Sequence, residues 1–517
     1  MSPGPPEFRS GIGLLRRDGR RAAIGDDVSA MGADDGFLAP PAAREVPLVV
    51  DLDGTLLATD ILVEGLAAFV CRNPANILPA LGWLLQGRAT LKRKLAEACP
   101  LDLTSLPFRE DVVDYARAEA AAGREVYVAT GADQDLAEAL LESLDFIKDV
   151  QGSDGVINLK GRRKAEALAA RFPDGFAYVG DSAADLEVWR VASGCVFAGG
   201  SAGVARRLGR LGVPVTRLPP PRAGFGDWIK LLRLHQWAKN GLVFLPLLLG
   251  GALFSATAWR NCALGFLAMG LMASGTYVLN DLVDLHSDRR HWSKKTRAFA
   301  SGLLPIWLGL ALAPACVAGG FALAALTGQL ALLLFLAAYL AATVSYSLKL
   351  KQTPILDAMM LAGLFTLRLA IGVVCAAVVW SPWLLVFSMF MFGSLSFAKR
   401  STELGRMEAA GLERLPGRGY VRADIPLVFA LGVSLSTAAT LVLVLYLIQD
   451  AFRHEFYHWP VGLWAMPVVV ALWTGRIWLL CGRRELHDDP VVFALKDKVS
   501  LALGAAGALG VLAAVFL

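Results

Sequence analysis

The strongest constraint on the fold is a series of long apolar segments that fills the chain after about residue 240. A helix needs roughly 20 apolar residues to cross the hydrocarbon core of a bilayer. Nine segments come near that length, at about 240–257, 260–281, 302–325, 329–347, 355–378, 380–397, 425–449, 460–481 and 499–517. We therefore expect the C-terminal part to be an all-α polytopic membrane bundle of nine transmembrane helices.

Lysine and arginine are distributed unequally over the loops between these segments. Their numbers are 5, 2, 6 and 4 in the loops 282–301, 348–354, 398–424 and 482–498, whereas the opposite loops hold little beyond Arg260 and Arg453. Basic loops stay in the cytoplasm. The first 40 residues also lack the apolar core of a signal peptide. The pattern predicts a multi-pass protein of the inner (cytoplasmic) membrane, with its N-terminal part in the cytoplasm and its C-terminus on the opposite side.

The chain before the bundle has the composition of a soluble α/β domain. Strand-like runs at 47–50, 125–130, 176–180 and 195–198 alternate with helix-forming segments, and this order is typical of a parallel, Rossmann-like sheet. We predict a disordered tail over 1–45, this domain over 46–200 with a helical insert at about 60–120, and a linker over 201–227. The membrane domain then covers 228–517.

Polar residues follow three of these strand-like runs. Asp51-Leu52-Asp53-Gly54-Thr55 comes directly after the first run, and open α/β sheets bind ligands at that edge. Thr130 ends the second run, and the segment from Gly180 to Asp185 begins at the end of the third.

These motifs, with Lys164, resemble those of the haloacid dehalogenase superfamily of phosphatases and phosphotransferases. The resemblance implies that Asp51 is the nucleophile and Asp53 the general acid and base. It also implies that Thr130 holds a phosphate oxygen and that Lys164, rather than Lys160, neutralises charge. The implied Mg²⁺ ligands are Asp51, Asp53, Asp181 and Asp185, and the helical insert resembles the cap of that superfamily. The alternative is a non-catalytic phosphatase-like module on a membrane scaffold.

An acidic stretch at the end of the second apolar segment carries the second candidate site. Asp281, Asp284 and Asp288 are spaced three and four residues apart, so a helix presents all three carboxylates on one face. Such acids repel each other unless a cation lies between them, and Mg²⁺ prefers oxygen ligands and commonly binds substrate phosphates. We predict a Mg²⁺-diphosphate site here. The alternative is an ordinary solvated loop after a membrane span.

Cationic residues cluster on the same side of the predicted membrane. Arg368 lies well inside a span, where an ionisable group is costly and usually functional. Asp357 precedes it by three turns and would meet it only through a bridging ligand. The residues that we expect to bind substrate are Asn280, Lys294, Arg297, Tyr346, Lys349, Lys351, Asp357, Arg368, Lys399 and Arg400.

This part of the chain resembles the UbiA superfamily of intramembrane prenyltransferases, whose first acidic motif N-D-x-x-D-x-x-x-D is matched by Asn280, Asp281, Asp284 and Asp288. A second acidic motif is missing, because Asp357 is the single acid between 341 and 400. That departure resembles the branch typified by decaprenyl-phosphate phosphoribosyltransferase. It implies Mg²⁺, a soluble donor such as phosphoribosyl diphosphate, and a polyprenyl phosphate acceptor in the lipid bilayer.

The resemblance also defines the alternatives. A conventional family member would move a prenyl group from prenyl diphosphate to an aromatic or other small acceptor. In the favoured interpretation, the N-terminal domain acts nearby as a phosphatase that removes the 5-phosphate from the lipid-linked product. We expect no nucleic-acid partner.

Overall fold

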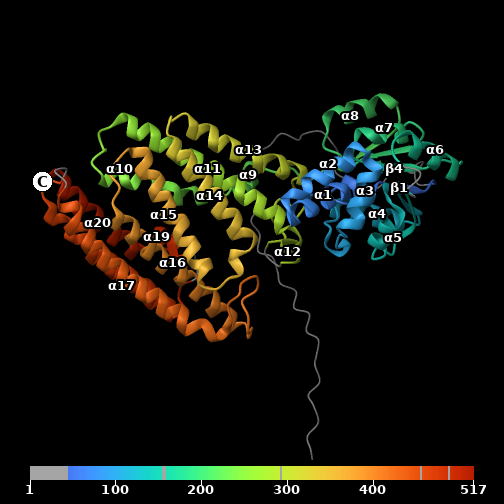
Figure 1. Cartoon of the computed structure of the whole chain (residues 1–517). Helices are drawn as coiled ribbons and strands as arrows, with labels where there is room; N and C mark the ends of the chain where they lie inside the picture. The colour runs from blue at the N-terminus through green and yellow to red at the C-terminus, as the bar shows by residue number, and fades with distance from the viewer. Residues whose placement is uncertain (1–44, 154–158, 292–293, 454–456, 487–489) are drawn as a thin grey trace, which may run out of the picture.

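The computed structural model describes residues 45–153, 159–291, 294–453, 457–486 and 490–517. A sheet-containing part and a helical bundle lie side by side along the molecule (Figure 1). The prediction of an α/β domain followed by a helical membrane domain is confirmed in this coarse form. The predicted tail falls outside the described residues, except for its last residue.

The N-terminal part is built on a six-stranded sheet in which every pair of neighbouring strands is parallel. The strand order is β3-β2-β1-β4-β5-β6. The strands are β1 (Leu48–Val50), β2 (Val126–Asp133), β3 (Ile147–Ser153), β4 (Ala177–Gly180), β5 (Gly194–Phe197) and β6 (Val215–Arg217). Leu48 and Val50 belong to a core cluster on one face, whereas Val49 belongs to a cluster on the other. Because both faces are covered, the strand is apolar throughout.

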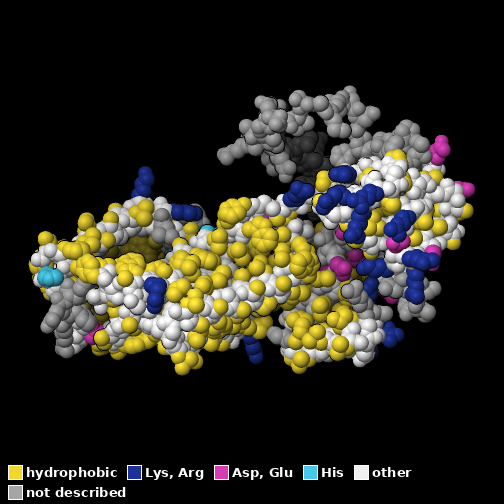
Figure 2. Space-filling model, turned by 90° about the horizontal axis from the view of Figure 1, so that it is seen from above, with side chains coloured by type: hydrophobic (Ala, Val, Ile, Leu, Met, Phe, Trp, Pro, Cys, Tyr) yellow, Lys and Arg dark blue, Asp and Glu magenta, His cyan; other side chains and the backbone are white. Residues whose placement is uncertain are grey.

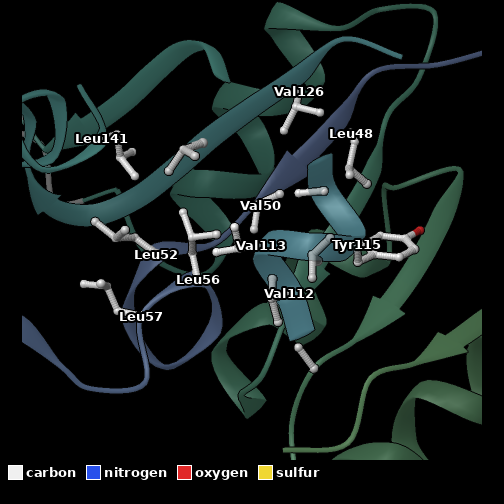
Figure 3. Close-up of a cluster of buried hydrophobic side chains, with 14 of the residues drawn as sticks. Leu48, Val50, Leu52, Leu56, Leu57, Val112, Val113, Tyr115, Val126 and Leu141 are labelled. Atoms are coloured by element: carbon white, nitrogen blue, oxygen red, sulfur yellow. The ribbon is translucent and has the colours of Figure 1, made fainter. Parts of the chain in front are cut away.

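Helices pack on both faces of this sheet. Val112, Val113 and Tyr115 of α4 (Glu110–Ala121) meet the strand residues Leu48 and Val50 in one core (Figure 3). The α4 helix therefore belongs to the sheet and not to the predicted insert at 60–120. The insert itself consists of α1 (Ile61–Arg72), α2 (Ile77–Leu85) and α3 (Arg88–Ala98). The remaining helices here are α5 (Gln134–Leu141), α6 (Arg162–Arg171), α7 (Leu186–Trp189) and α8 (Ala202–Leu208).

The sheet extends into residues that the composition predicts to be a linker. Helix α8 and strand β6 both lie within 201–227, and β6 pairs with β5 from Cys195 opposite Val215 onward. The linker prediction is therefore wrong for these residues. A three-residue strand between Pro214 and the prolines at 219–221 is too short for a hydrophobic period to be recognised.

The bundle has eight helices long and apolar enough to cross a membrane among the described residues. They are α11 (Ala256–Val283), α13 (Ile306–Ala325), α14 (Leu330–Leu348), α15 (Leu356–Ala376), α16 (Pro382–Ala409), α17 (Ile425–Gln449), α18 (Ala465–Gly482) and α20 (Lys498–Phe516). Apolar side chains cover most of the visible bundle surface, whereas lysine and arginine gather on the N-terminal part (Figure 2). An apolar outer surface is what contact with lipid tails requires.

The first predicted span differs from a transmembrane α-helix. It forms an eleven-residue 3₁₀ segment, η7 (Leu234–Phe244), followed by the five-residue α10 (Leu245–Leu249). Arg233 contacts Asp281 at one end, and the Leu249 carbonyl accepts the Tyr457 hydroxyl at the other. The segment thus lies alongside the bundle but is not an α-helix of spanning length. The predicted count of nine helices is therefore not confirmed. Pro246 and the flanking glycines restrict the α-helix to five residues.

The two parts of the molecule are joined by a buried ion pair and an apolar contact. The Arg289 guanidinium of α12 (Leu285–Arg290) donates to both Glu64 oxygens of α1, at 3.2 and 2.5 Å, and each side chain is only 4% exposed. Ala67 of α1 packs with Leu282 and Leu285 in one cluster. α1 therefore lies directly against the end of α11 that carries the acidic stretch.

We expect Glu64→Ala to loosen this docking, because it leaves Arg289 buried without a counter-charge. Removing one partner of a buried pair costs about 3–5 kcal/mol. Hydrogen exchange of the full chain in detergent should show faster exchange in α1 and in residues 285–291. Glu97→Ala is the matched control, since it breaks only an exposed pair with Lys94 worth about 0–1 kcal/mol. Equal protection of α1 in both variants would contradict the assignment.

Candidate active sites

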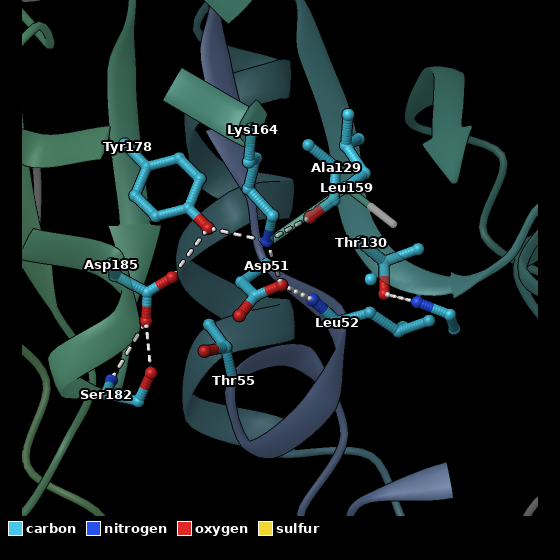
Figure 4. Close-up of polar contacts among 12 residues, drawn as sticks. Asp51, Leu52, Thr55, Ala129, Thr130, Leu159, Lys164, Tyr178, Ser182 and Asp185 are labelled. Carbon is cyan, nitrogen blue, oxygen red and sulfur yellow. Dashed lines mark hydrogen bonds and ion pairs between the residues drawn. The ribbon is translucent and has the colours of Figure 1, made fainter. Parts of the chain in front are cut away.

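The first site lies at the carboxyl end of β1, where Asp51 follows the strand. Lys164 of α6 donates from Nζ to Asp51 Oδ1 at 2.8 Å, to the Ala129 carbonyl at 3.0 Å and to the Tyr178 hydroxyl at 3.0 Å (Figure 4). Lys164 is therefore the lysine that reaches the predicted nucleophile, while Lys160 is exposed. The Ala129 and Tyr178 oxygens fix the ammonium group against the carboxylate.

Three carboxylates of this site form a group that can hold a metal ion. Ligand atoms of Asp51, Asp181 and Asp185 all lie within 4.8 Å of one another. Asp185 is held by the Tyr178 hydroxyl at 3.0 Å and by the Ser182 amide and hydroxyl. Gly54 has φ +74°, and a Cβ there would lie 2.7 Å from an Asp181 oxygen, so glycine lets the turn approach the acid.

The acids of this site resist ionisation. Burial raises the pKa of Asp51 against the opposing charge of Lys164. Burial and the neighbouring Asp185 raise the pKa of Asp181 to about 7. For Asp53, burial and then Asp60 raise the pKa to about 7. A divalent cation stabilises the ionised form of such a cluster, so the donor set fits Mg²⁺.

Two predicted residues of this site, Asp53 and Thr130, bond backbone amides. The Asp53 carboxylate accepts the Ile61 amide at 3.0 Å, at the start of α1, and lies outside the metal group found among the described residues. Thr130 is fully buried, and its hydroxyl accepts the Ala132 amide at 3.0 Å. The sequence motif predicts that both residues lie near Asp51 at the edge of the sheet. It does not predict the hydrogen-bond partners of their side chains.

The second site is the acidic stretch at the end of α11. Arg297 donates from Nη1 to Asp281 at 3.0 Å and to Asp288 at 2.5 Å, and Arg233 also contacts Asp281. Lys351 lies 3.3 Å from Asp284, and Lys294 lies 3.6 Å from Asp288. The structure thus brings Lys294, Arg297 and Lys351 to the acids as predicted substrate-binding residues.

The carboxylates of this stretch are shared among cations rather than gathered around one point. Asn280 donates to Asp284 at 2.9 Å, so all four motif residues are engaged. Asp281 and Asp288 are buried, and Asp288 Oδ1, which lies 3.6 Å from Lys294 Nζ, accepts no hydrogen bond within the described part of the chain. An unsatisfied carboxylate oxygen beside an all-oxygen set is compatible with a divalent cation. Arg233, which lies seven residues before the first apolar segment, was not identified from the sequence.

The predicted residues Tyr346, Asp357 and Arg400 form a separate polar network near the same end of the bundle. Asp357 is completely buried and contacts Arg400 at 2.5 Å, Arg418 at 3.5 Å and the Tyr420 hydroxyl at 2.6 Å. Tyr346 accepts hydrogen bonds from Arg400 and Arg418. Arg418 and Tyr420 come from a Gly-Arg-Gly-Tyr loop whose role the sequence does not reveal.

The other predicted cations occupy different places. Arg368 donates to the Asn240 side chain at 2.9 Å and to the Tyr339 hydroxyl at 2.9 Å, so it is satisfied within the bundle and does not meet Asp357. Lys349 is exposed and Lys399 is half-buried. Of the two lysines in the loop after α14, Lys351 is the one that reaches the acidic stretch.

Fold and sequence together define an integral membrane protein, and comparison with known proteins defines its family. The UbiA prenyltransferase family model matches residues 243–515. The chain therefore belongs to the UbiA prenyltransferase family. It is also 40% identical over 464 residues to the uncharacterized protein y4nM of Sinorhizobium fredii, covering 89% of this chain and 90% of that protein.

Two further relatives match a little more than half of the chain. Nodulation protein NoeC of Azorhizobium caulinodans is 35% identical over 54% of this chain and 89% of that protein. Decaprenyl-phosphate phosphoribosyltransferase of Corynebacterium glutamicum is 30% identical over 58% of this chain and 89% of that protein. A solved UbiA homolog from Archaeoglobus fulgidus bound to DMAPP and Mg²⁺ aligns with TM-score 0.44 and 15% identity, covering 56% of this chain and 97% of that chain.

The raised pKa values at the first site predict a defined response to pH and Mg²⁺. A carboxyl whose folded pKa is about 7 stabilises the folded state when protonated, and this contribution is lost as pH rises through 7. Without Mg²⁺, the free energy of unfolding of the N-terminal part should therefore fall by about 1–3 kcal/mol between pH 6 and pH 8. Its melting temperature should fall with it. Added Mg²⁺ should restore it at pH 8.

Asp181→Asn should abolish the Mg²⁺ effect, because it removes a ligand, and should weaken the pH effect, because Asp53 keeps its own raised pKa of about 7. Asp174→Asn is the matched control, since Asp174 is exposed and lies outside the group. The measurement is thermal unfolding of the full chain. If Mg²⁺ raised the melting temperature of Asp181→Asn as much as that of the unsubstituted chain, this acid would not be a ligand.

Proposed function

We propose that the bundle transfers phosphoribose, or a similar activated sugar phosphate, from a soluble diphosphate donor to polyprenyl phosphate. The observation that carries the proposal is the excess of cations around the acidic stretch. Four cations, Arg233, Lys294, Arg297 and Lys351, contact its three aspartates. The donor has a diphosphate and a further phosphate, and the acceptor adds another, so this reaction needs several cations.

The buried Asp357 supports the same choice. If the bundle were a conventional prenyltransferase, a second acidic group would be expected to provide a second metal site. Asp357 instead bonds Arg400, Arg418 and Tyr420 and is 0% exposed. Similarity to a decaprenyl-phosphate phosphoribosyltransferase over 58% of this chain points in the same direction.

The reaction assigns a role to each group. Asp281, Asp284 and Asp288 would hold Mg²⁺, which neutralises the diphosphate leaving group when bound. Arg297 and Lys351, released from the acids, bind the donor phosphates, and Asn280 orients Asp284. A phosphate oxygen of the lipid forms a bond to the anomeric carbon while the bond from that carbon to the diphosphate breaks. Positive charge develops on the sugar as the diphosphate leaves.

The proposed orientation places the acidic stretch at the cytoplasmic face of the inner membrane. Helix α12, which carries Asp288, lies at the end of the bundle beside the sheet-containing part, and the C-terminus lies at the far end (Figure 1). The positive-inside rule supports this orientation. Soluble diphosphate donors would then reach the acidic stretch from the cytoplasm.

We further propose that the N-terminal part is a haloacid dehalogenase-type phosphatase. The Asp51–Lys164 contact of 2.8 Å and the three-acid metal group support this function. Asp51 attacks phosphorus, the ester P–O bond breaks, and Asp53 protonates the leaving oxygen; water then hydrolyses the aspartyl phosphate. A pKa of about 7 for Asp53 suits a general acid and base near neutral pH. The favoured substrate is the 5-phosphate of the lipid-linked product.

Transfer is tested with the purified full chain, decaprenyl phosphate, Mg²⁺ and phosphoribosyl diphosphate labelled in the sugar. Label should enter the lipid fraction, and Asp288→Asn should lower the rate about 100-fold or more, because it removes a ligand for the leaving group's cation. Glu413→Gln, an exposed acid of the loop after α16, is the control. If label stays in the aqueous phase while prenyl diphosphate and an aromatic acceptor yield product, the bundle is a conventional prenyltransferase.

Phosphatase action is tested separately with donor labelled in its 5-phosphate. The unsubstituted chain should release labelled inorganic phosphate from the lipid product. Asp51→Asn should retain transfer but release phosphate at least about 1,000-fold more slowly, because the nucleophile is lost. Release at the same rate in both proteins would rule out Asp51 as the nucleophile.

A further inference from the structure

A cavity of about 480 Å³ lies between the helical insert and the bundle. One wall is formed by α1 and by the residues after α3, including Ala68 and Cys71. The other is formed by α11, α12 and the end of α14, including Leu285, Leu348 and Lys351. Its volume falls within the roughly 300–1,000 Å³ of small-molecule sites.

This interdomain cavity adjoins groups from both sites. Lys351 lines the cavity and also lies 3.3 Å from Asp284 of the acidic stretch. Helix α1 lines it from the other side, and the first amide of that helix is held by Asp53 at 3.0 Å. Ala68 lies seven residues beyond that amide, about 10 Å along the helix. The cavity thus lies between the donor site and the phosphatase site.

The walls of the cavity have the chemistry of an amphiphile's binding site. Leu282, Leu285 and Leu348 provide an apolar surface, whereas Arg72 and Lys351 provide cations that bind phosphate. Glu64 also lines it, but its charge is neutralised by Arg289. A prenyl chain near its phosphate needs this combination of apolar and cationic groups.

We propose that the interdomain cavity binds the lipid-linked sugar phosphate after it leaves the transfer site and before it is dephosphorylated. The first isoprene units pack on the leucines, and the phosphates lie beside Lys351 and Arg72. The proposal rests on the proposed function of both sites. Because the two parts belong to one chain, the product passes from the transfer site to the phosphatase site without release into the bilayer.

The proposal is tested by filling the cavity. Ala68→Trp places an indole in it from α1, and Leu348→Trp does so from α14, so damage to one helix cannot explain both results. Ala96→Trp is the matched control, because Ala96 is exposed on α3 outside the lining. Each full-length protein is placed in nanodiscs with decaprenyl phosphate, and three rates are measured. These are transfer of label to lipid, release of 5-phosphate from lipid, and hydrolysis of p-nitrophenyl phosphate.

Both cavity-filling variants should keep transfer and p-nitrophenyl phosphate hydrolysis within about twofold of the control, and should slow release from lipid at least about tenfold. The lipid-linked phosphate ester then accumulates. Release as fast as in Ala96→Trp would overturn the proposal. It would also be overturned if hydrolysis of p-nitrophenyl phosphate fell in step with release in both variants. Failure of the underlying functions is distinct, because the unsubstituted chain would then show no transfer or no release.

Discussion

Repulsion among the three aspartates of the acidic stretch is the constraint on which the rest of the structure depends. Buried carboxylates at the end of a span need counter-charges, and here these come from three separate segments of the chain. Arg233 precedes the first apolar segment, Lys294 and Arg297 follow α12, and Lys351 follows α14. Satisfying the acids therefore fixes how the loops of one bundle end are arranged. In the proposed reaction, these cations bind substrate phosphates once a metal ion replaces them at the acids.

The acidic stretch also determines where the N-terminal part docks. Asp288 and Arg289 are neighbours on α12, yet Asp288 faces Arg297 of the donor site and Arg289 faces Glu64 of the insert. Thirteen residues after Arg289, Gly302 has φ +73°, and a Cβ there would lie 2.4 Å from that of Ala58. Ala58 follows the Asp51 loop, so the segment after α12 contacts the acidic stretch through Arg297 and the end of the Asp51 loop through Gly302. The two proposed active sites are linked through this contact.

Much of this arrangement follows from sequence because local patterns carry it. The run before Asp51 predicts a buried strand, and the spacing of Asp281, Asp284 and Asp288 predicts a common face. Partners that are distant in the chain are not predictable in this way: Lys351 meets Asp284 from 67 residues away, and Arg418 meets Asp357 through a loop without periodicity. The 3₁₀ form of η7 and the three-residue strand β6 also cannot be predicted from hydrophobic periodicity. Arg368 is identified by its depth in the membrane, but its partners Asn240 and Tyr339 are not.

The central claim is that Mg²⁺ and a diphosphate donor displace the internal cations of the acidic stretch. Anomalous diffraction from crystals of the full chain with Mn²⁺ and phosphoribosyl diphosphate tests it most directly. The account predicts one peak among the carboxylates of Asp281, Asp284 and Asp288, with the Arg297 guanidinium moved from the acids to the donor. The group formed by Asp51, Asp181 and Asp185 supplies an internal reference peak. A peak at that reference alone, with Arg297 still joining Asp281 to Asp288, would contradict the account.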